Sequence, residues 1–352
     1  MSTKVHEVNE DIEQVFDYAC AHGWSDGLPI IPPTEERVAR MMAAVDLKPD
    51  TVIAHLPPRR GDVTVEKLAV NAVMAGCTPA CFPIIIAGTE ACDDPNLNIY
   101  SLNTTTNSVV PAFIINGPIR KELDINCGWG CLGHGWRANA TIGRAMSLVM
   151  LNVSGRIPEQ VCKSTHKQPG AYAFCFGEYE ERSPWEPLHV ERGFKREDST
   201  VTVLGPSGTT NVIDHDSQTG EDILYTIASS MMCIGSNNFS PYYGEGEMGV
   251  VLCPPHADLI GKEFPTKQQV KEYLLRETSK IPLSWLPERR RKALVQKSGA
   301  GQVQGEFARM AARADQFMIV VAGGLGGYHS VVLPTFGTYA VTKLIRRPAR
   351  AE

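Results

Sequence analysis

The sequence predicts an α/β fold in which a mixed sheet is flanked by helices. Three segments with helical periodicity are each followed by a short β-branched run: EKLAVNAVMAG before FPIIIAG, EDILYTIASSMMCIG before MGVVLCP, and GEFARMAARAD before QFMIVVAGG. Alternation of this kind is typical of a sheet covered by helices. Because the first two units share their order of features, two similar α/β halves are an alternative to one continuous sheet.

The chain divides into three parts. Residues 1–60 form an N-terminal helical and proline-rich segment, residues 61–200 a first α/β unit, and residues 201–352 a second. With 352 residues, of which 43% are hydrophobic and 21% charged, the chain is long enough for one large or two medium domains. This composition excludes a disordered protein.

The first predicted elements are helices with recognisable ends. One helix runs from a cap near Asn9 to Gly23, and the next starts near Thr34. A third, from Thr64 to Gly76, is apolar on almost every side and should be buried. Further strands are predicted in VVPAFIING and STVTVLG, and ligand sites are expected where strands end.

The densest group of functional residue types is NCGWGCLGHGWRANATIGR, residues 126–144. A glycine-rich loop that opens a helix presents unpaired N–H groups to an anion, and two arginines and a threonine then share one helix face. We expect a small anion such as a carboxylate or phosphate here. Its predicted ligands are Asn126, Gly133, Arg137, Asn139, Thr141 and Arg144. In the alternative, the glycines serve turns and the arginines pair with acidic residues.

A second glycine-rich loop, AGGLGGYHS, follows the last predicted strand of a helix-strand unit. It lacks the dinucleotide pattern GxGxxG because His329 occupies the final glycine position. Its glycines can form a backbone nest for an oxygen atom, with polar groups close behind. The predicted contacts are Gly323, Gly324, His329 and Ser330, and a plain tight turn is the alternative.

Two of the ten cysteines, Cys77 and Cys127, are predicted in turns and are the candidate nucleophiles, since only a thiolate near a cation or imidazole is reactive at neutral pH. The candidate acid–base groups are His134, His189 and Glu178, the last two from a long irregular segment. Cysteines in apolar elements should be small core residues. These are Cys20, Cys92, Cys233 and Cys253.

Cysteine usage and charge limit the cofactors and partners. Cys127, Cys131 and His134 offer soft ligands to a metal ion as an alternative, and no other cofactor is predicted. No signal peptide precedes the ten cysteines, so we expect reduced thiols and a cytoplasmic protein. A net charge of −5 argues against a nucleic-acid partner, and the apolar runs are too short for a membrane span. A homo-oligomer remains open.

Several of these segments also carry a resemblance that covers nearly the whole chain. GWSDGLPIIPPTEERV, TVEKLAVNAVMAGCTP, INGPI, GHGWRANATIGRA, SPWEPLHVERGF and VVAGGLGGYHS together resemble an uncharacterised bacterial family of soluble proteins, sometimes associated with small proteins that bear a UGSC selenocysteine/cysteine motif. The resemblance implies a thiol or selenol redox partner and reductive or thiol-dependent chemistry. Cys127 and Cys131 depart from the family pattern, which has smaller residues there.

Together these observations predict a cytoplasmic enzyme that acts on a small anionic substrate by thiol-dependent or acid–base chemistry. The reaction class is open, with a thiol-dependent transferase, lyase or reductase favoured. Two alternatives come from other classes. One is a non-catalytic substrate-binding subunit of a two-component reductase, and the other is a hydrolase or lyase with a Cys/His metal site.

Overall fold

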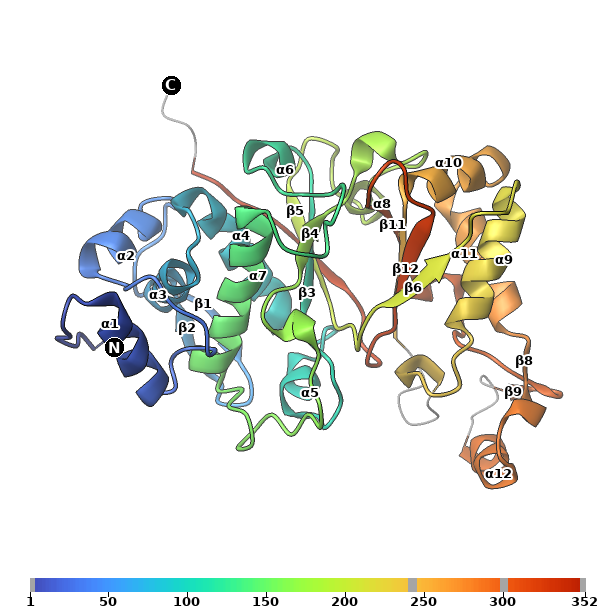
Figure 1. Cartoon of the computed structure of the whole chain (residues 1–352), viewed down its shortest axis with the longest axis horizontal. Helices are drawn as coiled ribbons and strands as arrows, with labels where there is room; N and C mark the ends of the chain where they lie inside the picture. Colours follow the sequence, from blue (N-terminus) through green and yellow to red (C-terminus); the bar gives the residue numbers. More distant parts are fainter. Residues whose placement is uncertain (1–3, 240–245, 298–302, 349–352) are drawn as a thin grey trace.

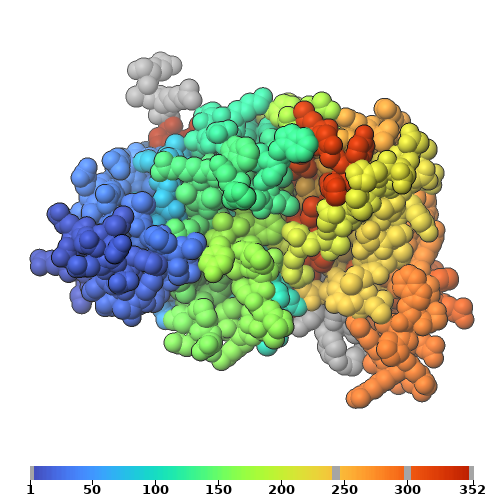
Figure 2. All heavy atoms as spheres, in the orientation of Figure 1, coloured from blue at the N-terminus to red at the C-terminus, as the bar shows by residue number. Residues whose placement is uncertain are grey.

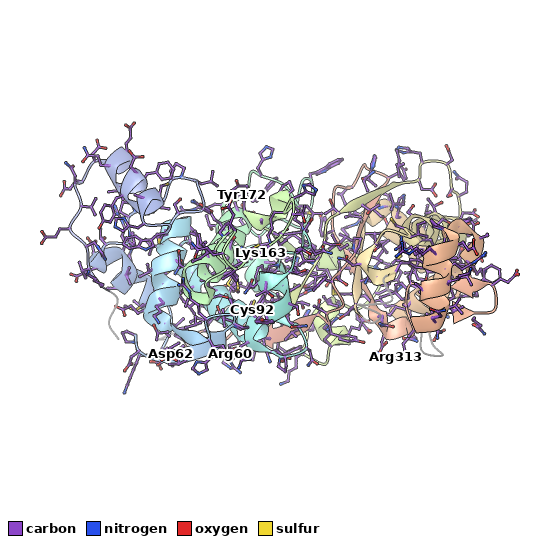
Figure 3. All side chains as sticks on the ribbon, turned by 90° about the horizontal axis from the view of Figure 1, so that it is seen from below. Arg60, Asp62, Cys92, Lys163, Tyr172 and Arg313 are labelled. Carbon is purple, nitrogen blue, oxygen red and sulfur yellow. The ribbon has the colours of Figure 1, made fainter. Side chains whose placement is uncertain are left out.

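The protein has an α/β fold, seen in a computed structural model that describes residues 4–239, 246–297 and 303–348 (Figure 1). Two four-stranded mixed sheets lie side by side, and helices cover the outer side of each (Figure 1). Figure 3, turned by 90°, shows the same elongated arrangement, with Arg60 and Asp62 in one half and Arg313 in the other.

The first half contains the N-terminal helices, a hairpin and the first sheet. Its helices are α1 (Ile12–Ala21), α2 (Glu35–Met42), α3 (Val65–Ala75), α4 (Phe82–Asp93), α5 (Ile99–Thr104), α6 (Ile119–Glu122) and α7 (Arg137–Val149). Helix α8 (Leu188–Glu191) lies beside the second half, where Glu191 pairs with Lys267 and Lys271 (Figure 1). The hairpin is β1 (Val52–Leu56) with β2 (Gly61–Thr64). The sheet has the order β13 (Val341–Leu344), β5 (Thr200–Leu204), β3 (Ala112–Asn116) and β4 (Cys175–Gly177).

The second half contains the other sheet and a small three-stranded sheet. Its main sheet has the order β11 (Phe317–Val321), β7 (Met248–Leu252), β12 (His329–Leu333) and β6 (Thr210–Ile213). Its helices are α9 (Gly220–Met231), α10 (Pro254–Glu263), α11 (Lys267–Thr278) and α12 (Glu288–Lys297). The small sheet consists of β8 (Ile281–Pro282), β10 (Phe307–Ala308) and β9 (Val303–Gln304).

Strands β3 and β5 of the first sheet and β7 and β11 of the second are buried on both faces. Side chains alternate along a strand, so in β3 Phe113 and Ile115 join the core shared with the first-half helices, while Ala112 and Ile114 face the second sheet. In β11, Phe317, Ile319 and Val321 likewise contact the second-half helices, and Met318 and Val320 face the first sheet. The layers are therefore helix, sheet, sheet, helix.

The two sheets have the same pattern of strand directions and exchange their outer strands. In each, one parallel pair (β3 with β4, β7 with β11) is extended by two antiparallel strands. After β5 in the first sheet the chain passes to the second sheet, where it forms β6. After β12 in the second sheet it returns to the first, where it forms β13. The crossing segments pair through Ser207 N to Pro334 O at 2.7 Å and Phe336 N to Gly205 O at 3.2 Å. Residues 341–344, placed by sequence in the second unit, thus complete the first sheet.

Local signals fix several helix ends where the sequence predicts them. The hydroxyl of Thr34 accepts the N–H of Arg37, that of Thr64 accepts the N–H of Lys67, and Gly76 ends α3 with φ +89°. The cap of α1 is Asp11 rather than Asn9, because the Asp11 carboxylate takes the first free N–H groups of the helix.

Two sequence predictions of elements are wrong. The segment FPIIIAG, predicted as a strand, is the first part of α4: it is buried on all sides, and a short apolar run cannot by periodicity distinguish a buried helix from a buried strand. The segment GEFARMAARAD, predicted as a helix, forms β10 and an irregular turn. There β10 pairs with β8, and Met310 N donates to the Thr278 carbonyl at 3.2 Å, so tertiary contacts override helix propensity.

None of the helices within the described ranges has the length and apolar character that a membrane crossing requires.

Candidate functional site

The carboxyl ends of the parallel strands meet where the two halves join, and we call this region the rim (residues 116–135, 177–181 and 322–330). Tyr179 N donates to Val321 O at 2.6 Å, and Gly323 N donates to Cys127 O at 2.9 Å. In Figure 2 the red segment of the second half reaches the surface between the green first half and the yellow and orange second half. The rim therefore brings together both glycine-rich loops that the sequence singles out.

The first glycine-rich loop is fastened by two buried asparagines. Asn139 in α7 accepts the Asn126 N–H at 2.8 Å and donates to the Asn126 carbonyl at 3.0 Å. The side chain of Asn126 accepts the Gly128 N–H and donates to the Trp129 carbonyl, each at 2.8 Å. Gly133 N donates to Gly130 O. The side chains of Asn126 and Asn139, predicted to bind an anion, thus form hydrogen bonds that fix the conformation of the loop.

The two loops pack through Trp129 and Gly324. A Cβ atom at Gly324 would lie 2.2 Å from the Trp129 ring, so only glycine fits beneath the indole. Trp129 remains 62% exposed on its other side. The close approach of backbone and ring explains one of the glycines without a ligand, and it leaves a large aromatic surface beside Cys127.

A buried network of carboxylates, an amide and a guanidinium lies behind this surface. Asn116, at the end of β3, donates to Glu178 Oε2 at 2.6 Å and to Glu180 Oε1 at 3.0 Å. Arg120, 4% exposed, contacts Glu180 Oε2 and Glu181 Oε1, each at 3.0 Å. The pKa of Glu181 is lowered to about 2, because hydrogen bonds from Arg120 and from Lys121 outweigh its partial burial.

Cys127 lies at the open side of the network. It is half-buried, and its Sγ is 3.9 Å from Nη1 of Arg120. Burial raises the pKa of the thiol above its ordinary value, while the charge of Arg120 opposes that rise. Arg120 is therefore placed to stabilise negative charge on this sulfur.

The other predicted acid–base residues occupy different settings. Glu178 is fully buried, with Oε2 bound by the Leu188 N–H and Oε1 3.7 Å from Lys267 Nζ of the second half. His189 is also fully buried, and its Nδ1 is 4.0 Å from Glu180 Oε1. His134 is exposed on the glycine-rich loop. Glu178 and His189 thus belong to the network behind Cys127, whereas His134 stands apart.

The other candidate thiol, Cys77, lies at a separate corner between α3 and α7. Its Sγ donates to the Thr141 carbonyl at 3.2 Å, and burial raises its pKa to about 12. Arg137 donates to the Gly76 carbonyl at 3.0 Å, and Arg144 forms a two-point ion pair with Asp26 at 2.8 and 2.9 Å. The arginine–threonine face predicted to hold an anion instead joins α7 to α3 and to the N-terminal segment.

The polar residues of the second loop also bind within the protein. Ser330 Oγ is 2.8 Å from Nδ1 of His256, whose Nε2 donates to the Asp214 carbonyl at 3.0 Å. His329 is exposed and contacts Asn211. Gly323 adopts φ +124° beside Cys253. Ser330, the last residue of the rim, and His256 are both buried, so neither side chain is exposed to a ligand at the surface.

The prediction that four cysteines are core residues is right for two of them and wrong for the other two. Cys92 and Cys253 are buried, but Cys20 and Cys233 are exposed. In α1 the buried position is Ala19, and the next residue points about 100° away round the helix. Cys233 follows the end of α9, outside the helix face that packs on the sheet.

Within the described part of the chain, no group of three or more His, Cys, Asp or Glu side chains is arranged to hold a metal ion. Cys127, Cys131 and His134 therefore do not form such a group. Burial raises the pKa of Cys131 to about 12.

The chain matches no known protein family model, and no curated protein matches it. The evidence on function is therefore the geometry of the chain's own residues.

Sequence reasoning finds Cys127, Glu178 and His189 but misses the residues that connect them. Arg120 and Glu180 give no motif: the arginine is four residues past the end of β3, and the carboxylate follows β4. The available signal is that both positions follow strand ends, where α/β proteins place ligand sites. The pairing of β3 with β4, which brings these two positions together, joins residues that are distant in sequence and cannot be read from a local pattern.

Proposed function

We propose that the protein is an enzyme that acts on a small anionic substrate, with the Cys127 thiol as its nucleophile. The observation that carries the proposal is the contact between the half-buried Cys127 sulfur and the buried Arg120 guanidinium, 3.9 Å apart at the rim. The competing thiol, Cys77, is buried and has a pKa of about 12. Of the two candidates, Cys127 is therefore the better nucleophile.

Arg120 supports the reaction by balancing the negative charge that forms when Cys127 loses its proton. The carboxylates of Glu180 and Glu181 hold the guanidinium in place. Glu178 and His189 lie behind Arg120 and position this assembly rather than touching the substrate. Because burial raises the Cys127 pKa, the resting group is a thiol and its reactivity should rise with pH.

A thiol or selenol redox partner fits the same site. Exchange with a partner needs an accessible sulfur, and Cys127 is half-buried beside the exposed Trp129. A reducing, cytoplasmic setting would keep this thiol free. The proposed reductive reaction would use the partner to regenerate Cys127 after each turnover.

The test has two parts. Iodoacetamide labelling followed by peptide mass spectrometry should modify Cys127 much faster than Cys77, and the Cys127 rate should increase with pH. Incubation of the protein with a cytoplasmic metabolite extract, with and without a reduced thiol, should then reveal an anion that wild type consumes.

Three variants distinguish a catalytic role of Cys127 and Arg120 from a role in the stability of the fold alone. Cys127→Ser should abolish consumption of that anion, Arg120→Lys should reduce it, and Cys20→Ser, an exposed cysteine on α1, should leave it unchanged. Normal consumption by a folded Cys127→Ser protein would rule out the proposed nucleophile. Binding of the anion without conversion, even with a reduced thiol present, would favour a substrate-binding subunit.

A further inference from the structure

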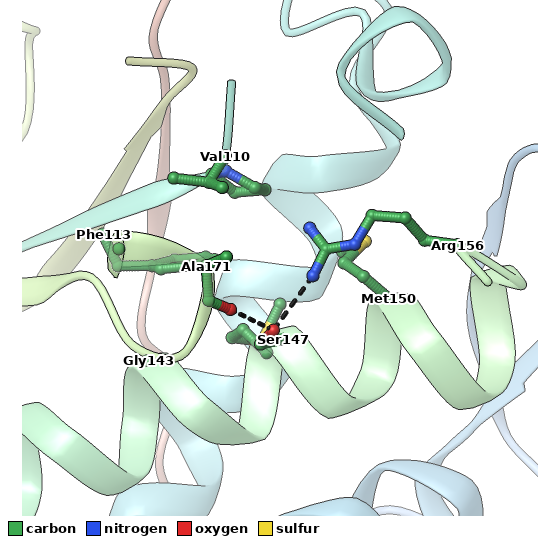
Figure 4. A pocket seen from close by; sticks show the side chains of 10 residues that line it. Val110, Phe113, Gly143, Ser147, Met150, Arg156 and Ala171 are labelled. Atoms are coloured by element: carbon green, nitrogen blue, oxygen red, sulfur yellow. Dashed lines mark hydrogen bonds between the residues drawn. The ribbon is translucent and has the colours of Figure 1, made fainter. Parts of the chain in front are cut away.

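A second site lies away from the rim, near the start of β3. A small pocket opens between this strand, helix α7 and the following loop (Figure 4). Its walls combine small and apolar residues with two polar side chains. The lining residues are Val110, Pro111, Phe113, Gly143, Met146, Ser147, Met150, Arg156, Gly170 and Ala171.

Arg156 supplies a buried positive charge to this pocket. The side chain comes from the residue after Gly155, just past the π-helical turn Met150–Ser154 that ends α7, and it is 7% exposed. Its Nη2 donates to Ser147 Oγ at 2.9 Å, and that hydroxyl donates to the Ala171 carbonyl at 2.6 Å (Figure 4). A π-helical turn of this kind is frequent at functional sites.

Among the described residues, no carboxylate forms an ion pair with Arg156. The one hydrogen bond that the Arg156 side chain donates to these residues goes to Ser147 Oγ. A guanidinium has five N–H donors, so the other N–H groups of Arg156 are not bound to acceptors of the described residues. Burial lowers the Arg156 pKa, which reflects the energetic cost of a charge without a counter-ion. An anion in the pocket would remove that cost.

A second cation and a thiol lie near enough to Arg156 to interact with its charge. Lys167 Nζ donates to the Val109 carbonyl at 2.9 Å and is 3.6 Å from Cys162 Sγ. No ion pair joins Lys167 to a carboxylate in the described ranges. Burial and the charge of Arg156 lower the Lys167 pKa to about 8, so the amine is close to its titration range at neutral pH. Cys162 is half-buried.

The size of the pocket restricts the ligand. Its cavity volume of about 10 Å³ is roughly that of one water-sized sphere. A bulky group is excluded by Phe113, Met146 and Met150. One oxygen of a carboxylate or inorganic oxyanion fits, with the remainder of the ligand toward Lys167 and Cys162.

We propose that Arg156, Ser147 and Lys167 form a binding site for a small oxyanion, placed so that the bound anion lies beside the nucleophilic thiol of Cys162. This site is separate from the rim and does not depend on Cys127. The two cations act together: Arg156 holds the oxyanion in the pocket, and Lys167, whose Nζ is 3.6 Å from Cys162 Sγ, supplies a second positive charge to the bound anion.

The probe is iodoacetate, a small carboxylate that alkylates thiolates, compared with the neutral iodoacetamide. In either reaction the Cys162 sulfur attacks the CH₂ group, a C–S bond forms and iodide leaves. We expect the ratio of the iodoacetate rate to the iodoacetamide rate to be about tenfold higher at Cys162 than at the exposed Cys20, as for a gain of one charge-assisted contact. Peptide mass spectrometry of the full chain assigns each modified residue.

Variants and a competitor test the assignment. Arg156→Met should reduce the Cys162 ratio to that of Cys20, whereas Lys163→Met, which removes an exposed cation from the same loop, should not change it. Millimolar inorganic phosphate should slow iodoacetate at Cys162 but not at Cys20. Equal ratios at the two cysteines, or an unchanged ratio in folded Arg156→Met, would overturn the proposal. If Arg156→Met does not fold, absence of phosphate protection in wild type would overturn it.

Discussion

Arg144 lies within α7 and Arg156 just beyond its end, yet only Arg144 is neutralised by a carboxylate of the described residues. Arg144, within α7, forms a two-point ion pair with Asp26 at 2.8 and 2.9 Å and also donates to the Leu28 carbonyl. Arg156, just beyond the end of α7, is buried more deeply, and its side chain donates to the Ser147 hydroxyl. The first arginine joins two segments, and the second borders a pocket.

The difference shows that an arginine in a glycine-rich setting is not evidence of an anion site. What decides is whether a carboxylate of the protein already neutralises the guanidinium. The sequence pattern favours Arg144 as an anion ligand because it lies in the dense motif. The ion pairs of the folded chain favour Arg156 instead, because no described carboxylate neutralises it. Four measurements test this difference between the two arginines.

Removal of Arg144 should have the largest effect. Arg144→Ala leaves the Asp26 carboxylate, 11% exposed, without its partner, and breaking a buried pair in this way costs about 3–5 kcal/mol. The free energy of unfolding, measured by urea denaturation, should fall by that amount. The double variant Asp26→Ala, Arg144→Ala should be less destabilised than the sum of the two single variants. A loss below about 1 kcal/mol, as for surface pairs, would contradict the structural role.

Removal of Arg156 should have a smaller effect of opposite sign. Arg156→Met replaces an uncompensated buried charge with an apolar chain of similar length, so the free energy of unfolding should rise by about 1 kcal/mol or more. Phosphate should raise the melting temperature of wild type but not of this variant, since a ligand stabilises the state that binds it. Destabilisation as large as that of Arg144→Ala would show that both arginines are structural.

The titration of Lys167 provides a pH test. Its folded-state pKa is about 8, below the ordinary value of 10.5, so between these values the unfolded state binds more protons. The charged lysine therefore destabilises the fold below pH 8, and this penalty disappears as pH rises toward 10.5.

Both proteins in this comparison should carry Cys162→Ser, so that the neighbouring thiol does not titrate. Lys167→Met should be more stable than its lysine parent at pH 7, and the difference should narrow steadily above pH 8. A difference that is constant from pH 7 to pH 10.5 would show that the amine is not perturbed.

The smallest effects concern cysteine accessibility. Cys77, at the same corner as Arg144, and the buried Cys92 should react with iodoacetamide far more slowly than Cys20, because burial raises the pKa of both Cys77 and Cys92. Cys127 and Cys162 should react at intermediate or high rates. Rapid labelling of Cys77 in the native state would require that the α3–α7 corner opens, and would revive the anion site predicted there.

Sequence reasoning predicted the α/β class and the helix ends that depend on local chemistry. Thr34, Thr64 and Gly76 act within one turn of the chain, so their roles can be read from neighbouring residues. The predictions fail where burial is complete or tertiary contacts decide. FPIIIAG has no polar face to reveal its period, and GEFARMAARAD is not a helix because its backbone pairs with residues 278–282, which are distant in sequence.

The candidate sites show the same limit. Cys127 could be selected because its loop is unusual in sequence, but the contact with Arg120 depends on how β3 and β4 end beside each other. Arg156 carries no motif at all. Its distinguishing property is the lack of an ion pair with the described carboxylates, and the sequence cannot display that property because partners are set by the fold.

The exchange of outer strands has a consequence for synthesis of the protein. Strand β13, residues 341–344, pairs with β5 and completes the first sheet, although β5 is made some 140 residues earlier, as the numbers of the paired residues show. Until residues 341–344 leave the ribosome, β5 lacks its partner on one side, and such an open strand edge can pair with other chains. The first sheet therefore cannot be completed during translation before residues 341–344 have been made.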